Sequence, residues 1–293
     1  MNADTAPRPH DARGRLLLVP NTLDLGTTAQ AITTVLPAAV LHEAARLGHW
    51  LAEDAKSTRA FLKRVHDVVP LAAPLQSVVI TELPRPPKGG GRPSGPSRGP
   101  AGPAGTPGPA GAGGAAGSAV GAGPATGPML LAPALAGHDI GLLSEAGLPA
   151  VADPGATVVA AAHALGLQVV PLAGPSSLML ALAASGLDGQ SFAFVGYLPQ
   201  EPAARAARIR ALEAQSQRVH QTQIFIETPY RNAALLRALL EIAAPATKLS
   251  VSVGLTLPGG FSRTATIAQW RQRMKEAAEP LPDRLPAVFL LQA

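Results

Sequence analysis

The chain has 293 residues, no cysteine, and only 15% charged and 3% aromatic residues. The lack of cysteine excludes thiol chemistry, disulfide bonds and cysteine-ligated zinc. The net charge of +5 leaves two interpretations open, an anionic partner such as a nucleic acid or ordinary surface charge. The length allows one large domain or two smaller ones, and we expect two.

The first half of the chain alternates short apolar runs with helical spacing. The pattern predicts strands at 15–19, 49–53, 77–83, 140–143 and 168–172, and helices at 37–47, 57–65, 129–136, 155–165 and 174–184. Alternation of this kind is typical of an α/β fold with a parallel sheet.

A low-complexity stretch at residues 84–128 interrupts this alternation. Glycine recurs at every third position from 99 to 117, which is the collagen period. The stretch is short, rich in alanine and flanked by globular patterns, so we expect a disordered insertion rather than a triple helix. We also expect residues 1–14 to form a disordered tail.

A second set of elements follows Gly186. The pattern predicts a strand and loop at 192–199, strands at 223–227, 249–253, 261–267 and 287–291, and helices at 202–217, 231–242 and 269–277. We therefore expect an N-terminal α/β domain at 15–173 and a C-terminal α/β domain at 174–293. The start of the chain has no signal-like apolar region, and no apolar run reaches the roughly 20 residues of a membrane span, so we expect a cytoplasmic protein.

Several familiar chemistries lack their motifs. There is no P-loop sequence, no G-x-S-x-G, and no G-x-G-x-x-G after a predicted strand. The seven histidines are scattered without the spacing of metal ligands, so we expect no metal site. A site built from loops for a small molecule remains.

Polar residues do follow the predicted strands. In open α/β sheets ligands bind beyond the carboxyl ends of the strands. The pairs at these ends are Pro20-Asn21, Glu53-Asp54, Ser144-Glu145, Pro175-Ser176 and Glu227-Thr228. Asp153 has two interpretations, contact with a ligand or a helix N-cap, because Asp-Pro-Gly here precedes an apolar helix.

Four stretches of the sequence occur in the order found in a known family. They are LLLVPNTLDLG, AEDAKSTRAFL, the long run LLSEAGLPAVADPGATVVAAAHALGLQVVPLAGPSS, and IFIETPYR. With them the chain resembles the tetrapyrrole methylase superfamily, and within it the branch that methylates small-subunit ribosomal RNA. The resemblance covers nearly the whole chain except the tail and the insertion.

The resemblance implies two α/β/α domains, S-adenosylmethionine in the cleft between them, and a homodimer. Carried over by position, the cofactor-binding residues are Pro20, Ser144, Glu145, Ala146, Gly147, Asp153, Pro175, Ser176, Ser177, Tyr197 and Leu198. The implied partner is ribosomal RNA or the small ribosomal subunit, and the implied reaction is 2′-O-methylation of a cytidine.

The chain departs from the ribosomal branch in the loops that face the substrate. Its first loop reads Pro20-Asn21-Thr22-Leu23-Asp24 where Pro-Thr-Pro-Ile-Gly-Asn is usual, and Tyr230 replaces a usual histidine. The Gly-Pro-Gly-Asp-Pro loop of the corrin and sirohaem methylases is absent, which argues against a porphyrin substrate. We expect the substrate-binding residues to be Lys56, Arg59, Tyr230 and Arg231.

A ribose hydroxyl must lose its proton during methyl transfer, and the candidate general bases are Glu53, Asp54 and Glu227. Each could instead be a helix cap or part of an ion pair. Three alternatives stay open: an enzyme of the same fold that acts on a small metabolite, a cofactor-binding protein without catalysis, and RNA capture by the basic residues of the insertion.

Overall fold

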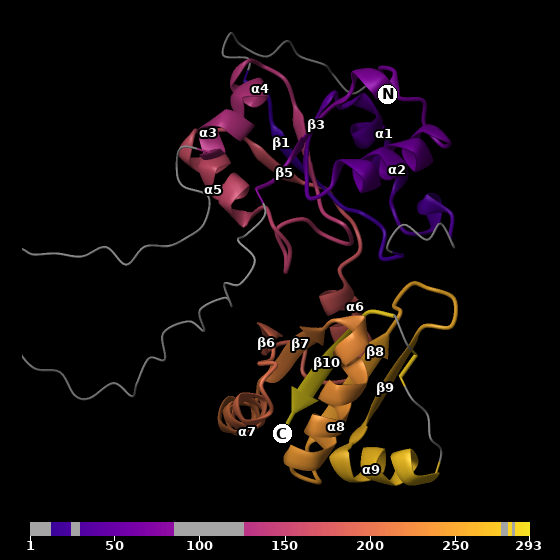
Figure 1. The fold of residues 1–293 in the computed structure, drawn as a ribbon, viewed down its shortest axis with the longest axis vertical. Helices are drawn as coiled ribbons and strands as arrows, with labels where there is room; N and C mark the ends of the chain where they lie inside the picture. The colour runs from indigo at the N-terminus through magenta and orange to yellow at the C-terminus, as the bar shows by residue number, and fades with distance from the viewer. Residues whose placement is uncertain (1–12, 25–29, 85–125, 277–280, 283–284) are drawn as a thin grey trace, which may run out of the picture.

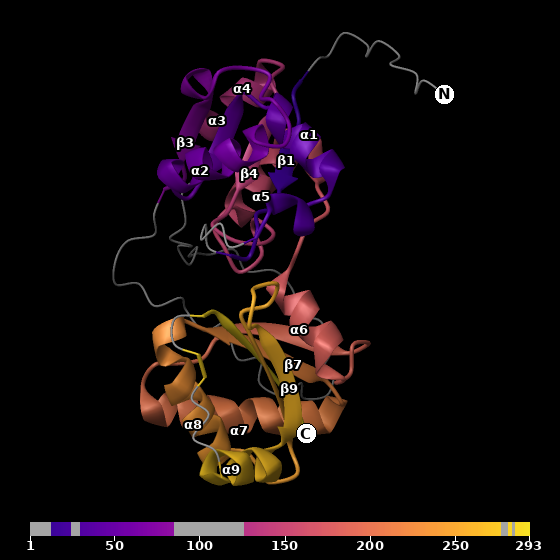
Figure 2. The same ribbon diagram turned by 90° about the vertical axis from the view of Figure 1, so that its right-hand side faces the viewer.

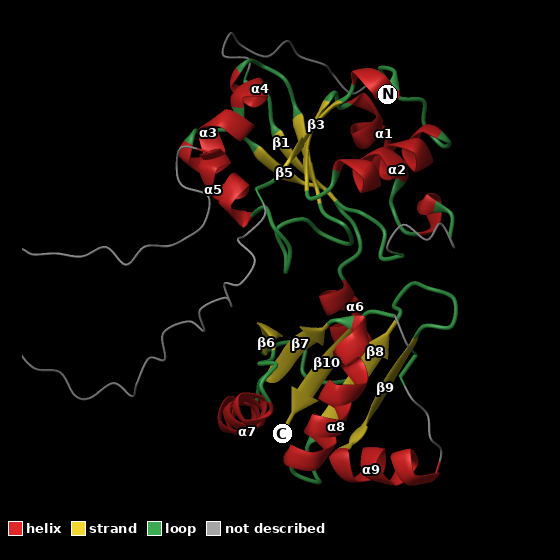
Figure 3. Cartoon of the chain, in the orientation of Figure 1, coloured by secondary structure: helices red, strands yellow, loops and turns green. Residues whose placement is uncertain are grey.

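The structure, a computed structural model, describes residues 13–24, 30–84, 126–276, 281–282 and 285–293. The described chain forms an N-terminal and a C-terminal half, each built on one five-stranded sheet (Figure 1). Strands occupy the middle of each half and helices cover them (Figure 3). The chain passes from the end of β5 through residues 172–176 into α6 (Figure 1).

The N-terminal sheet is entirely parallel, in the order β3-β2-β4-β1-β5. Its strands are β1 (Leu16–Val19), β2 (His49–Ala52), β3 (Val79–Glu82), β4 (Ile140–Leu143) and β5 (Val169–Pro171). The central strands β1 and β4 are almost completely buried, which explains why they read as continuous apolar runs instead of alternating patterns.

Two groups of helices cover this sheet. Side chains of α1 (Ala38–Arg46) and α2 (Ala55–His66) pack with Leu17, Val19 and Trp50 on one face. Side chains of α4 (Ala132–Leu135) and α5 (Ala156–Ala164) pack with Leu16 and Ile140 on the other. The remaining elements of this half are η1 (Ile32–Thr34), η2 (Leu75–Ser77) and α3 (Thr126–Leu130).

The C-terminal sheet is mixed, in the order β6-β7-β10-β8-β9. Its strands are β6 (Phe192–Tyr197), β7 (Thr222–Glu227), β8 (Lys248–Val253), β9 (Phe261–Thr266) and β10 (Ala287–Gln292). Strands β6 and β7 are parallel, whereas β10 runs antiparallel to both β7 and β8. The last strand of the described chain therefore lies at the centre of the sheet.

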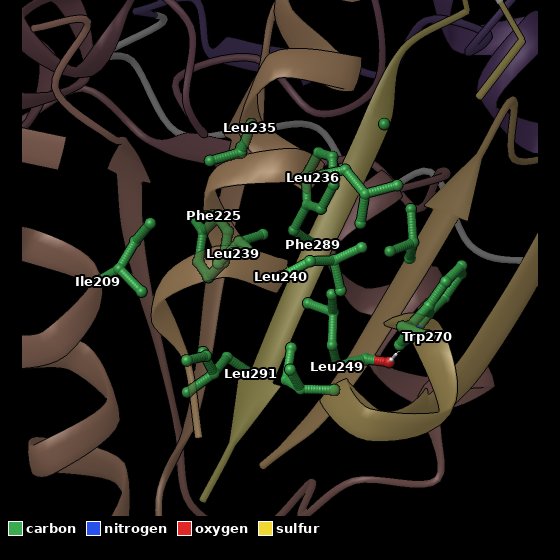
Figure 4. Packing of buried hydrophobic residues seen from close by; sticks show 14 of the residues in the cluster. Ile209, Phe225, Leu235, Leu236, Leu239, Leu240, Leu249, Trp270, Phe289 and Leu291 are labelled. Atoms are coloured by element: carbon green, nitrogen blue, oxygen red, sulfur yellow. Dashed lines mark hydrogen bonds between the residues drawn. The ribbon is translucent and has the colours of Figure 1, made fainter. Parts of the chain in front are cut away.

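The larger C-terminal core lies between this sheet and the helices α7 (Pro202–Val219), α8 (Asn232–Ile242) and α9 (Ile267–Glu276). The rings of Phe225 and Phe289 stack across neighbouring strands with centroids 5.9 Å apart (Figure 4). The indole N–H of Trp270 donates to the carbonyl oxygen of Leu249 at 2.9 Å, so the ring is buried with its polar group paired. Helix α6 (Ser177–Ser185) packs on the opposite face through Leu178 and Leu182 (Figure 2).

The predicted fold class is confirmed, since both halves have helices on both faces of a sheet. The single helix predicted at 129–136 is wrong. The structure has α3 and α4 there, because Pro133 lacks a backbone N–H and lies in the first turn of a new helix.

The predicted insertion falls mainly on residues 85–125, outside the described residues, and α3 begins within its predicted end. The boundary between the two domains, predicted between residues 173 and 174, stays a prediction. None of the described helices is long and apolar enough to cross a membrane.

Candidate functional site

The loop after β4 is held in place by the loop after β1. Asn21 and Gly147 form an isolated antiparallel bridge with N···O distances of 2.9 and 3.2 Å. The side-chain amide of Asn21 also donates to the carbonyl oxygens of Ser144 (3.0 Å) and Glu145 (3.1 Å), and its own oxygen accepts from the backbone N–H of Thr22. Because Asn21 is only 8% exposed, water competes little for these bonds.

The rest of this loop carries unusual backbone conformations. The φ angles of Gly147, Ala150, Ala152 and Gly155 are 71°, 66°, 65° and 125°. For the two alanines such a conformation costs about 1–3 kcal/mol each, and this kind of strain concentrates at ligand sites. Gly155 is the N-cap of α5, so the helix-cap interpretation of Asp153 is wrong.

Three carboxyl groups gather where β2 and β4 end. Burial raises the pKa of Glu53 to about 7, with a further rise from the charge of Asp153 and an opposing hydrogen bond from the backbone of Glu145. Burial also raises the pKa of Asp153 to about 6, against a hydrogen bond from Ser144 and together with the charge of Glu145. Within the described chain, Oε1 of Glu53 is buried and has no hydrogen-bond partner. Glu53 can therefore exchange a proton near neutral pH.

The neighbouring acid, Asp54, has a structural role. It is the N-cap of α2 and accepts a hydrogen bond from the backbone N–H of Ser57 at 2.8 Å. The hydroxyl of Ser57 donates to Glu145 at 2.7 Å, which ties the start of α2 to the loop after β4. Lys56 and Arg59 of this helix are exposed.

In the C-terminal half, Glu227 forms an ion pair with Arg231. One of its oxygens accepts from Nε and Nη2 of Arg231 at 2.9 and 2.7 Å and from the backbone N–H of Thr228 at 2.7 Å. The other oxygen, Oε2, is buried without a partner in the described structure. Burial raises the pKa of Tyr197, the charges of Asp153 and Glu227 raise it further, and Arg231 opposes them. Tyr197 therefore lies within electrostatic range of acids from both halves.

Between the halves lies a cleft of about 540 Å³, within the size range of small-molecule sites. Its lining includes Gln30, Thr34, Val35, Pro175, Leu180 and Thr256. A Cβ placed on Gly147 would lie 3.4 Å from the carbonyl oxygen of Pro175, so the loop after β4 adjoins the linker that lines the cleft. Thr256 has a φ of 69°, and its hydroxyl is buried without a partner in the described chain.

The remaining predicted cofactor-binding residues lie in three places. The loops after β1 and β4 meet, since Pro20 precedes Asn21, and Ser144, Glu145, Ala146 and Gly147 follow β4. Pro175 lines the cleft, and Ser176 and Ser177 begin α6 without a side-chain cap. Leu198 is 3% exposed and packs in the C-terminal core, so its side chain offers little surface to a ligand.

Two further residues were missed as site residues. The sequence pattern places Asn21 only in a strand-end pair, and its position within the unusual first loop is the available signal. Thr256 follows Gly254 in a glycine- and proline-containing loop, and nothing in the local pattern marks its strained backbone.

The comparisons with known proteins agree with this architecture. A sequence model of the family described as Tetrapyrrole (Corrin/Porphyrin) Methylases matches residues 115–270. That stretch is more than half of the chain, so the protein belongs to this family, as the sequence resemblance predicted. A solved structure of the methyltransferase CobJ aligns with 94% of this chain and 93% of its own, at a TM-score of 0.51 and 12% identity, and shows the same fold.

The similar curated sequences carry a more specific name. A Ribosomal RNA small subunit methyltransferase I from Mesorhizobium japonicum is 40% identical over 141 residues, which are 48% of this chain and 47% of that protein. One from Pseudomonas aeruginosa is 41% identical over 106 residues, 36% of this chain and 35% of that protein. The matched stretch therefore spans half or less of the length of these relatives.

Proposed function

We propose that this protein is an S-adenosylmethionine-dependent methyltransferase that modifies small-subunit ribosomal RNA, by 2′-O-methylation of a cytidine. The observation that carries the substrate class is the 40% identity over 141 residues to a ribosomal RNA small subunit methyltransferase. The structure supports the proposal through loops from both halves that border one cleft.

The residues present fit the proposed cofactor. The cleft of about 540 Å³ has an apolar lining interrupted by threonine hydroxyls, which suits an adenosine group. Next to it, Gly147 has a φ of 71°, a conformation that suits glycine, and lets the loop after β4 lie close to the linker at Pro175. Glu145 and Asp153 supply negative charge for the positive charges of the ligand.

When bound, S-adenosylmethionine supplies an electrophilic methyl group on a sulfonium cation. The protein's own contribution is to hold the acceptor oxygen in line with that methyl group, an effect worth up to about 7–11 kcal/mol. The strained loop and its clamp by Asn21 provide the rigidity that such positioning requires.

Among the three candidate bases, the structure favours Glu53. Asp54 caps α2, and one oxygen of Glu227 already accepts three hydrogen bonds. Glu53 has a buried oxygen without a partner in the described chain and a pKa raised to about 7 by burial. A base of this strength can accept the proton of a ribose hydroxyl as the bond to the methyl group forms, which contributes about 10²- to 10⁴-fold to the rate.

The test is transfer of labelled methyl groups from S-adenosylmethionine to total RNA and to isolated small ribosomal subunits, followed by mapping of the label. We expect one labelled cytidine 2′-oxygen. Glu53→Gln should lower turnover at saturating cofactor by about 10²- to 10⁴-fold while cofactor binding persists. Glu227→Gln serves as the comparison. A larger loss of turnover in this variant than in Glu53→Gln would make Glu227 the general base instead of Glu53.

Two other functions are distinguished by the same assay. A methyltransferase acting on a small metabolite would label no RNA but would label a component of a metabolite extract. A cofactor-binding protein without catalysis would bind S-adenosylmethionine in calorimetry and label nothing. Failure to bind this cofactor would contradict all three functions.

We further propose that the protein acts as a homodimer in the cytoplasm, where its RNA substrate is present. Light scattering of the purified chain tests the oligomeric state. A mass of one chain at micromolar concentration would contradict the dimer.

A further inference from the structure

Tyrosine is rare in this protein, and both copies are exposed beside the site. The chain has only two tyrosines, Tyr197 at the end of β6 and Tyr230 in η3 (Pro229–Arg231) just after β7. Tyr197 is 55% exposed and Tyr230 is 87% exposed. A ring that packs against no core offers its face to a ligand, and nucleic-acid bases are ligands that stack on such faces.

A row of cations lies on the exposed face of α2. Lys56, Arg59 and Lys63 are spaced by three and four residues, which places them on one side of the helix, and all three are exposed. The opposite side of the helix, with Phe61, Leu62 and Val65 among others, is buried in the core. None of the three cations is in an ion pair with another described residue, so their charge is available to a partner.

The first turn of α2 and Tyr197 lie near the same group of carboxylates. Ser57, next to Lys56, donates a hydrogen bond to Glu145, whose charge acts on Asp153. The charge of Asp153 in turn acts on Tyr197, as does that of Arg231, the neighbour of Tyr230. A hydrogen bond and electrostatic interactions thus connect the first turn of α2 with Tyr197, and Arg231, which follows Tyr230 in the chain, acts on the same tyrosine.

From this placement we propose that the surface formed by α2 and the loop after β7 binds an unpaired stretch of RNA, with phosphates on Lys56, Arg59 and Lys63 and a base stacked on Tyr230. The inference rests on the proposed function and adds Lys63, the stacking role and the form of the RNA. Lys56 and Lys63 are seven positions apart, so the three cations span about 10 Å along the helix. This length is enough to contact more than one phosphate of a single strand.

Unpaired RNA fits this surface better than a duplex. In a double helix the base faces are covered by their neighbours, so an exposed tyrosine can stack only on a base that has left the helix. The carboxyl groups of Glu53, Glu145 and Asp153 repel phosphates from the interior of the site, which leaves the cations of α2 as the place for the backbone.

The experiment measures binding of a fluorescent single-stranded RNA, cut from the labelled region of the substrate, at several salt concentrations. The same RNA annealed to its complement is the second probe. We expect the full-length protein to bind the single strand more tightly than the duplex. Tyr230→Ala should weaken single-strand binding by about 5- to 150-fold, and Tyr230→Phe should restore it. Lys63→Ala should reduce the slope of log affinity against log salt by about 0.7.

Matched controls exist for both changes. Phe192→Ala removes a partly exposed ring at the opposite end of β6, and Lys275→Ala removes an exposed cation on α9, so both should leave binding unchanged. Equal binding of the duplex and the single strand, or wild-type affinity of Tyr230→Ala, would overturn the inference. If the wild-type protein methylates RNA but the variants and the duplex bind as the wild type and the single strand do, only the proposed RNA surface is contradicted. If the wild type neither binds nor labels RNA, the proposed function fails with it.

Discussion

The backbone of Gly174 lies directly against the ring of Pro20. A Cβ at residue 174 would come within 2.2 Å of the Pro20 Cβ and 2.4 Å of its Cγ. The linker between the halves is therefore packed on the loop after β1, and a small residue is required at this contact. The site depends on this packing, because the same linker lines the cleft.

Gly174→Ala should destabilise the protein by about 1–3 kcal/mol, since the added methyl group forces the linker away from Pro20. It should also weaken cofactor binding. Urea unfolding and calorimetry measure the two effects. Gly48→Ala is the control, because nothing lies within 4 Å of its added Cβ, and it should be tolerated. Equal behaviour of the two variants would show that the contact with Pro20 relaxes freely.

Asn21→Ala should cost about 1–3 kcal/mol of stability, because buried carbonyl groups of the loop after β4 lose their donors. We expect weaker cofactor binding in addition, since that loop would be released. Thr222→Val is the comparison, because it removes a buried hydrogen bond to Asp188 (2.9 Å) at the start of β7. It should lower stability without changing cofactor affinity. A loss of affinity in both variants would point to a general effect of destabilisation.

The stability of the protein should depend on pH through Glu53 and Asp153. The folded-state pKa of Glu53 is raised from 4.5 to about 7, so the folded state binds the proton more tightly than the unfolded state. Stability should therefore fall as the pH rises from about 4.5 to 7, and Glu53→Gln should flatten this fall and be more stable than the wild type at pH 8. Denaturant unfolding of both proteins across this pH range measures the free energy of unfolding. The same pH dependence in Glu53→Gln as in the wild type would show that Glu53 does not cause the fall.

Asp139 should show the opposite dependence. Burial works against its ionisation, but hydrogen bonds from Arg15 and Arg46 outweigh burial and hold its pKa well below the usual range. The stability from this group is present above its unfolded pKa and is lost as the pH falls. Asp139→Asn should therefore lower stability at neutral pH and reduce the loss of stability on acidification, measured in the same titration.

Arg231→Met should be strongly destabilising, by about 3–5 kcal/mol, because it leaves the buried carboxylate of Glu227 without its cation. Adding Glu227→Gln should recover part of this loss, since the remaining group is neutral. A double-mutant cycle of unfolding free energies gives the coupling, expected at about 0.5–3 kcal/mol. Simple additivity of the two changes would show that the pair does not interact in solution.

The amino-acid sequence alone determined most of the secondary structure and placed most candidate site residues at the ends of strands. Strand β4 was predicted at residues 140–143, where the structure has it, because buried parallel strands and amphipathic helices have periodicities that are visible locally. Glu53, Ser144 and Glu227 are predicted as candidates for the same reason, since each lies at or just after the end of such a strand.

Only the tertiary structure decided how these residues act. Glu53 and Asp153 lie 100 positions apart in the chain, and the pKa of each depends on burial and on charges that the fold brings near. Asn21 reaches Ser144 across 123 positions, and β10 enters the centre of a sheet begun by β6. Contacts of this kind leave no periodic pattern in the sequence, because they depend on the path of the whole chain rather than on the preferences of neighbouring residues.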